Sequence, residues 1–277
     1  MIEIDAGRPW WRVDFRELWA QRDLFLLLLR KDLLASYKQS LLGPAWFVIQ
    51  PLATSLVFAW VFGRFARLSP QGLPPFLYFL AGYVLWSYFQ GTVGATAGAL
   101  VANASILRKI YFPRLIIPLV ASGVHTVHFA VNYLLFLAIH TLYVLTGGVP
   151  AGFSPAIFWF APLIALFVGV TGAGVGLWLA AWTASYRDLR IGMPVILSFW
   201  MFATPIIWPL RLVPVDKRWL FGLNPMAAAV ELHRAVFLGV PIPDPLFLGI
   251  GAVVGLAAVA GGFFFFNRAQ RTLVDTL

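Results

Sequence analysis

One long segment of this sequence contains no charged residue at all. Between Arg114 and Arg187 there is no Lys, Arg, Asp or Glu. A helix on the surface of a water-soluble protein needs a polar face, so this segment excludes a water-soluble fold. The whole chain agrees, because 61% of its 277 residues are hydrophobic and only 11% are charged, whereas soluble domains carry about 25% charged residues. We therefore predict an all-α integral membrane protein.

Six apolar stretches are long enough to cross the hydrocarbon core as helices, which takes about 20 residues each. The first 44 residues are too charged to cross, so the chain divides into a segment 1–44 and a six-span domain 45–277. Within the first segment, apolar side chains recur at helical spacing over 15–37 between basic ones. This pattern predicts an amphipathic helix on the membrane surface. The predicted spans are 45–63, 75–98, 115–145, 157–183, 192–209 and 246–266.

The basic residues predict the orientation of these spans. Fourteen of the 20 Lys and Arg residues fall on the side of the N-terminus. Because cytoplasmic segments carry the excess of Lys and Arg, we expect both termini to be cytoplasmic. The net charge of +9 then reflects contact with anionic membrane lipids and not with nucleic acid.

The connection between the fifth and sixth predicted spans, residues 210–245, is too apolar to be a solvated loop. It includes a helix-compatible run, Met226 to Leu238, in which two residues of opposite charge lie three apart. We expect short, half-inserted helices in this region, and a surface loop with one amphipathic helix is the alternative. The residues of interest in it are Trp219, Asn224, Pro225, Glu231 and Arg234.

The third predicted span has one polar face. At 100° per residue, His125, His128, Asn132 and Tyr143 lie within one sector. Polar side chains are costly against lipid, so this face should contact protein or water. It is either a packing surface with satisfied hydrogen bonds or part of a substrate path. With no carboxylate nearby and no cysteine in the chain, we expect no metal site.

Catalytic motifs are absent from the sequence. None of the four lysines lies in a GxxxxGK[ST] pattern, so the chain cannot bind ATP through a P-loop. The acidic residues outside the N-terminal segment form no evident pair, which argues against a membrane-embedded glycosyltransferase. The spans hold no carboxylate and show no internal repeat, which argues against an ion-coupled transporter. The sequence thus favours a transport subunit without catalytic residues.

Four motifs in this chain resemble one family, in the same order. The run Arg30–Pro51 leads straight into the first span, the basic loop Leu107–Pro118 follows the second, and Tyr186–Asp188 and Asn224–Pro225 with Arg234 come later. Together they resemble type-two ABC transporter permeases that export polysaccharides such as O-antigen, capsule and teichoic acid. Permeases for drugs or lipids share this architecture and are the alternative.

That resemblance implies an assembly in the bacterial inner membrane. The chain would pair with a second copy of itself and with two separate ATPase subunits, which would bind ATP and Mg, and the chain itself would hold no cofactor. Its substrate would be a lipid-linked glycan. Residues 15–40 would be the interface helix, residues 101–112 the coupling helix and residues 211–240 the outer gate. The residues expected to contact the ATPase are Leu107, Arg108, Lys109, Tyr111 and Phe112.

Aromatic and polar side chains are mixed along two of the spans. In the second span, Tyr83, Ser87, Gln90 and Gly94 follow one face, with a tryptophan beside them. Sugar rings have apolar faces and polar rims, so a glycan conduit needs both kinds of side chain. The alternative is an interfacial aromatic belt with core packing. Our hypothesis is that the conduit is lined by Tyr83, Trp86, Gln90, Phe199 and Trp200.

Overall fold

The structure is a computed structural model that describes residues 15–38, 41–68, 72–107, 112–149, 156–183 and 186–269. Within these ranges every regular element is a helix, in agreement with the predicted all-α class. The α-helices are α1 (Phe15–Ala20), α2 (Arg22–Tyr37), α3 (Ala45–Phe58), α4 (Pro75–Ala102), α5 (Ala104–Leu107), α6 (Ile116–Leu145), α7 (Ala156–Thr183), α8 (Arg187–Ala203), α9 (Arg218–Gly222), α10 (Pro225–Leu238) and α11 (Pro245–Ala269). A π-helix, η1 (Ala59–Phe65), continues α3, and two 3₁₀ turns, η2 (Leu210–Leu212) and η3 (Val215–Lys217), precede α9.

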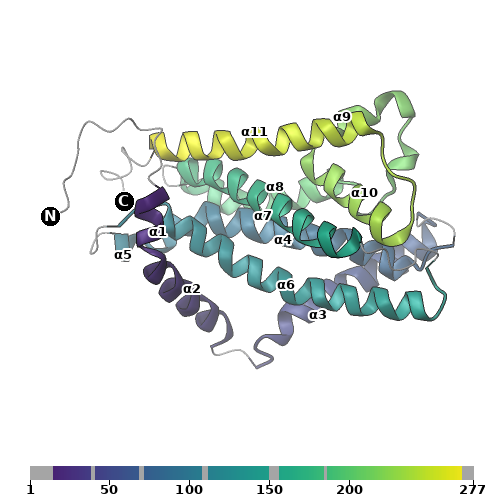
Figure 1. Cartoon of the computed structure of the whole chain (residues 1–277), viewed down its shortest axis with the longest axis horizontal. Helices are drawn as coiled ribbons and strands as arrows, with labels where there is room; N and C mark the ends of the chain where they lie inside the picture. Colours follow the sequence, from purple (N-terminus) through teal and green to yellow (C-terminus); the bar gives the residue numbers. More distant parts are fainter. Residues whose placement is uncertain are drawn as a thin grey trace.

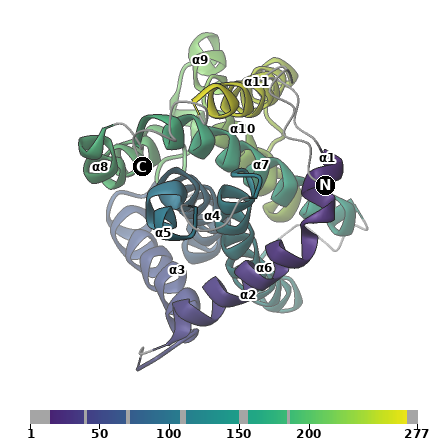
Figure 2. The same ribbon diagram turned by 90° about the vertical axis from the view of Figure 1, so that its left-hand side faces the viewer.

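Helix α4 is the centre of the bundle. Helices α3, α6, α7, α8 and α10 all contact it, and Figure 2 shows it enclosed by its neighbours. Its apolar and aromatic side chains point in all directions, as in any helix that others surround. Close packing against α7 requires glycine, because a Cβ atom at Gly176 would lie 2.6 Å from the Cβ of Thr96.

Four segments are long and apolar enough to cross a membrane. They coincide with the first, third, fourth and sixth predicted spans. Helices α4 and α8 occupy the places of the second and fifth, but α8 has only 17 residues and α4 mixes Tyr, Ser, Gln and Thr among its apolar residues. The protein is therefore an integral membrane protein with four candidate spans in the described residues. These are Ala45–Phe65, Ile116–Leu145, Trp159–Thr183 and Pro245–Ala269.

The fifth predicted span, 192–209, was misplaced. Helix α8 already begins at Arg187 and ends at Ala203. It ends there because a residue that precedes proline is disfavoured in the helical region, and Thr204, which precedes Pro205, is extended with φ −95° and ψ 139°. Because α8 begins at Arg187, only Tyr186 of the Tyr186–Asp188 motif lies outside the helix.

The N-terminal region forms two helices in place of the single one predicted over 15–37. Helix α2 packs along α6, where Leu28 is buried. Other leucines of α2, among them Leu26 and Leu27, are exposed beside charged residues such as Lys31. This distribution of exposed apolar and charged side chains is typical of helices at a membrane surface.

The segment between α8 and α11 folds back into the bundle. Helix α10 confirms the helix predicted over 226–238, and 11 of its 14 residues are buried. It contacts α4, α7, α9 and α11, so it is an internal element and not an amphipathic helix on the surface.

Helices α1 and α5 lie at one end of the molecule, and α9 lies toward the opposite end (Figure 1).

Candidate functional site

Arg234 connects three separate segments of the chain. Its side chain is fully buried, and its Nη1 atom lies 3.1 Å from the carboxylate of Glu231, three residues earlier in the chain. Nη2 donates a hydrogen bond of 2.7 Å to the Ile206 carbonyl, just after α8. Nη1 also donates to the hydroxyl of Tyr78 on α4 at 3.0 Å.

The contact with α4 is close and has a steric requirement. The Arg234 guanidinium carbon lies 3.7 Å from the centre of the Tyr78 ring, in a cation–π contact. Opposite the guanidinium is Gly82, where a Cβ atom would lie 2.7 Å from Nη2. A planar, permanently charged group with several donors can satisfy such a set of acceptors, which lysine cannot. We call Arg234, Glu231, Tyr78 and the Pro205–Ile206 turn the arginine clasp.

The Asn224–Pro225 pair starts α10 and attaches it to the end of α8. The Asn224 Oδ1 atom accepts a hydrogen bond from the backbone of Met226 at 3.1 Å, which caps the helix. Pro225 occupies the first helical position, where its missing N–H costs nothing. The Asn224 Nδ2 atom donates to Thr204 Oγ1 at 2.8 Å. Of the predicted gate residues, Asn224 and Pro225 therefore start α10, and Glu231 and Arg234 lie within it.

The fifth predicted gate residue, Trp219, does not belong to the arginine clasp. It is half-exposed and lines a cavity of about 570 Å³ beside α10. Arg211, Asp216 and Arg218 also line this cavity. Glu231 and Tyr78 lie in its wall as well, so the cavity borders the clasp.

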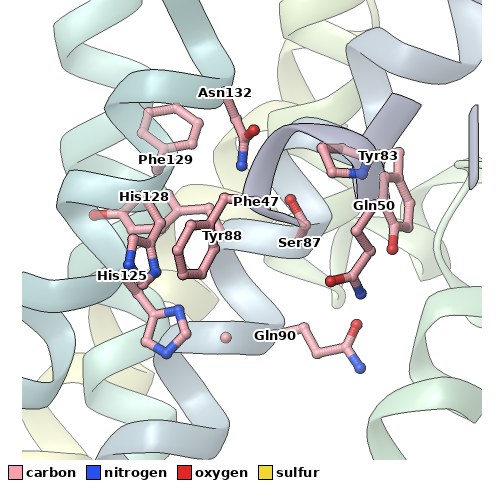
Figure 3. Close-up of a pocket in the computed structure, with 12 residues that line it drawn as sticks. Phe47, Gln50, Tyr83, Ser87, Tyr88, Gln90, His125, His128, Phe129 and Asn132 are labelled. Atoms are coloured by element: carbon pink, nitrogen blue, oxygen red, sulfur yellow. The ribbon is translucent and has the colours of Figure 1, made fainter. Parts of the chain in front are cut away.

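A polar cavity of about 300 Å³ lies between α3, α4 and α6. It includes two of the five predicted conduit residues, Tyr83 and Gln90. From α6 it receives His125, His128 and Asn132, so three of the four residues of the predicted polar face are directed at a cavity inside the protein, and Tyr143 is not among its lining residues (Figure 3). Its complete lining is Phe47, Gln50, Pro51, Tyr83, Ser87, Tyr88, Gln90, Gly91, His125, His128, Phe129 and Asn132.

The other three conduit residues lie elsewhere. Trp86 is fully buried, where its Nε1 atom donates to Gln90 Oε1 at 2.9 Å. Its ring contacts that of Trp200, with a centroid distance of 6.4 Å. Phe199 is 71% exposed and contacts neither cavity. The five predicted conduit residues therefore fall into three groups. Tyr83 and Gln90 line the cavity, Trp86 and Trp200 contact each other in the core, and Phe199 faces outward.

Only part of the predicted coupling segment is described. Arg108, Lys109 and Tyr111 lie outside the described residues, and the helix expected over 101–112 is represented by the last turn of α4 and the four residues of α5. Leu107 is half-buried, and Phe112 is 6% exposed. Phe112 packs in its own chain, in a cluster whose other buried members are Leu28, Ala99, Ile116, Ile117 and Val120.

Several buried polar contacts were not predicted from the sequence. The hydroxyl of Tyr133 on α6 lies 3.1 Å from Nε2 of His233 on α10. The Nε2 atom of His140 lies 2.7 Å from the Phe237 carbonyl oxygen. The helical spacing of the α6 histidines was the only signal for such contacts. In the described residues no three His, Cys, Asp or Glu side chains come close enough to hold a metal ion.

Comparison with known proteins extends over nearly the whole chain. This chain is 28% identical to the O-antigen export system permease protein RfbA of Myxococcus xanthus over 261 residues. The aligned part covers 92% of this chain and 96% of the relative. The chain is 25% identical over 259 residues to the protein of the same name from Klebsiella pneumoniae, covering 92% and 95%. The polysialic acid transport protein KpsM of Escherichia coli is 21% identical over 239 residues, covering 85% and 89%.

The profile of one protein family, described as ABC-2 type transporter, matches residues 23–238. The match includes the first predicted span, the polar cavity and the arginine clasp. The chain belongs to the ABC-2 type transporter family.

Proposed function

We propose that this chain is the membrane-spanning permease subunit of an ATP-driven exporter of lipid-linked polysaccharide. The observation that carries the proposal is similarity along nearly the whole chain to relatives named as O-antigen export permeases, within a matched ABC-2 domain. The substrate class is a glycan of the O-antigen, capsule or teichoic-acid type. An ABC-2 permease for a drug or lipid is the second candidate, and the polar, aromatic cavity favours the glycan.

The energy for export would come from partner subunits. The sequence has no P-loop, so ATP and Mg would bind to two separate ATPase subunits and not to this chain. The basic segment 107–112 is the proposed contact with them, and α5 at one end of the molecule supports this assignment (Figure 1). Because Phe112 is buried in its own chain, we propose that Leu107, Arg108, Lys109 and Tyr111 make the contact and that Phe112 holds the loop in place.

In the proposed topology, α4 and α8 cross the membrane together with the four candidate spans, which gives six. Both termini and α5 face the cytoplasm of a bacterial cell, and α9 and α10 form the outer gate. The distribution of Lys and Arg along the sequence supports this orientation. Helices α1 and α2 would lie at the inner membrane surface, where the exposed leucines of α2 contact lipid.

A second copy of the chain would complete the conduit. Tyr83 and Gln90 are the proposed lining residues within one chain, and exposed Phe199 on α8 is available to a second copy or to lipid. Buried Trp86 and partly buried Trp200 support this wall from behind. Weak, repeated contacts of this kind suit a long polymer that must slide.

Co-expression with the ATPase encoded beside this chain tests the proposal. We expect the two to purify together, and we expect surface glycan to disappear when the permease gene is deleted and to return with the wild-type gene. A deletion strain with normal surface glycan would refute the glycan substrate. A purified chain that transfers sugars without an ATPase would refute the transport role altogether.

A further inference from the structure

The cavity between α3, α4 and α6 has the chemistry of a binding site for a small, uncharged, hydroxylated ring. No Lys, Arg, Asp or Glu is among the residues that line it. Phosphate and carboxylate groups are usually bound by arginine or lysine, so an anionic lipid headgroup is a poor match. The volume of about 300 Å³ is at the lower end of the range for small-molecule pockets, about 300–1,000 Å³, so one ring fits better than a chain of rings.

Asn132 shows that this cavity is more than a packing defect. Its side chain is only 8% exposed, and its Oδ1 atom has no hydrogen-bond partner in the structure. An unsatisfied buried acceptor costs about 1–3 kcal/mol. Figure 3 shows the carboxamide directed toward the cavity from the α6 side. The chain therefore maintains a costly polar group in the wall of this cavity.

Two further carboxamides lie across the cavity. The Gln90 Oε1 atom accepts from Trp86 Nε1, which fixes its orientation and directs its Nε2 donors away from the indole. Gln50 on α3 lies beside Gln90 in Figure 3, opposite the histidines of α6. A carboxamide both donates and accepts, so the three together can bind adjacent hydroxyl groups.

Stacked aromatic rings form the rest of the wall. Phe47 of α3 stacks on His128 of α6, with ring centres 3.7 Å apart and planes inclined by 23°. Tyr88 of α4 stacks on Phe129 at 4.3 Å and 17°. Where these rings line the cavity they provide apolar surface that suits the C–H face of a sugar ring, while the carboxamides suit its rim.

We propose that this cavity is a binding subsite for one uncharged pyranose ring of the exported glycan, held by Asn132, Gln90 and Gln50. The inference rests on the proposed function, since it assigns a glycan-recognition role to a place within a single chain. The subsite is separate from the arginine clasp, because the two share no residue. It selects for ring chemistry and excludes charged headgroups.

Saturation-transfer NMR on the purified full chain, in a detergent without a sugar headgroup, tests the subsite. The probes are D-glucose, D-galactose, D-mannose and N-acetyl-D-glucosamine, each alone, with phosphoethanolamine as a charged comparison. The variants are Asn132→Leu, which keeps the side-chain shape, and Gln90→Leu. The control is Ser198→Ala on α8, whose exposed hydroxyl donates to the Pro194 carbonyl, outside the cavity.

At least one sugar should give a signal with the wild type and the control, and that signal should fall at least fivefold in both test variants. The melting temperature of Asn132→Leu should not fall, because the substitution removes an unpaired buried oxygen. No sugar signal with the wild type, an unchanged signal in both variants, or a stronger signal from phosphoethanolamine would overturn the subsite. Export by the wild-type complex without any sugar signal would leave the proposed function intact and reject only the subsite.

Discussion

Replacing Arg234 by methionine removes the centre of the arginine clasp. Methionine has a similar length but no charge, so it leaves the Glu231 carboxylate without its 3.1 Å partner. It also removes the donors to the backbone carbonyls of Tyr78, Pro205 and Ile206. Removing one partner of a buried ion pair costs about 3–5 kcal/mol, and the stranded carbonyls increase this cost.

A loss of that size is measurable as thermal stability. For large domains each 1 kcal/mol lowers the melting temperature by about 2–4 °C, so Arg234→Met should lower it by on the order of 10 °C. Glu231→Gln retains an oxygen that Arg234 can bond to and leaves the carbonyl bonds in place, so it should cost less, about 1–3 kcal/mol. Because the two residues interact, the double variant should cost less than the sum of the single variants.

The assay is thermal unfolding of the detergent-purified chain, compared with Ser198→Ala, an exposed control that should melt with the wild type. Arg234→Lys separates charge from geometry, since lysine keeps the charge but cannot form the same set of hydrogen bonds. We expect it to melt nearer to Arg234→Met than to the wild type. Each kcal/mol shifts the melting temperature by about 2–4 °C. If Arg234→Met melts within about 2 °C of the wild type, the arginine clasp is not a stabilising contact.

Three further predictions concern topology, coupling and the start of α10. Single cysteines in place of Lys109 and Lys217, treated on intact cells with an impermeant thiol reagent, should be labelled only at 217; labelling only at 109 would reverse the orientation. Tyr111→Ala should weaken ATPase association by on the order of 2 kcal/mol in pull-down titrations, with no change in melting temperature. Phe112→Ala should instead cost about 3 kcal/mol of stability, because Phe112 is buried, and equal stability of the two variants would contradict this division. Asn224→Ala should cost about 1–2 kcal/mol through loss of the helix cap, and an unchanged unfolding midpoint would argue against that role.

Hydrophobic runs were sufficient to predict where the long helices lie. Their positions follow from local composition, and the spacing of His125, His128 and Asn132 was sufficient to predict a polar face directed at protein. The end of α8 was missed because apolar residues continue past Ala203, although Pro205 already marked the break. At this position proline predicts the end of the helix better than hydropathy does.

Long-range contacts could not be read from the sequence. Tyr78 binds Arg234 across 156 residues, and no local pattern identifies a tyrosine of a buried helix as the partner of a distant arginine. The sequence also could not predict that Phe112 packs inward. A short aromatic segment of the same composition can either pack inside its own chain or contact a partner. Such choices are made by tertiary packing, which overrides local preference.

The most direct test of the account is transport by a defined complex. Vesicles that contain this chain and its ATPase, oriented with the ATPase outside, should move lipid-linked glycan from the outer to the inner leaflet only when ATP and Mg are supplied. Vesicles that contain the chain alone, or the complex with a hydrolysis-deficient ATPase, should move none. Glycan movement without the ATPase, or its absence from a complex that hydrolyses ATP, would contradict the assignment of this chain as a polysaccharide export permease.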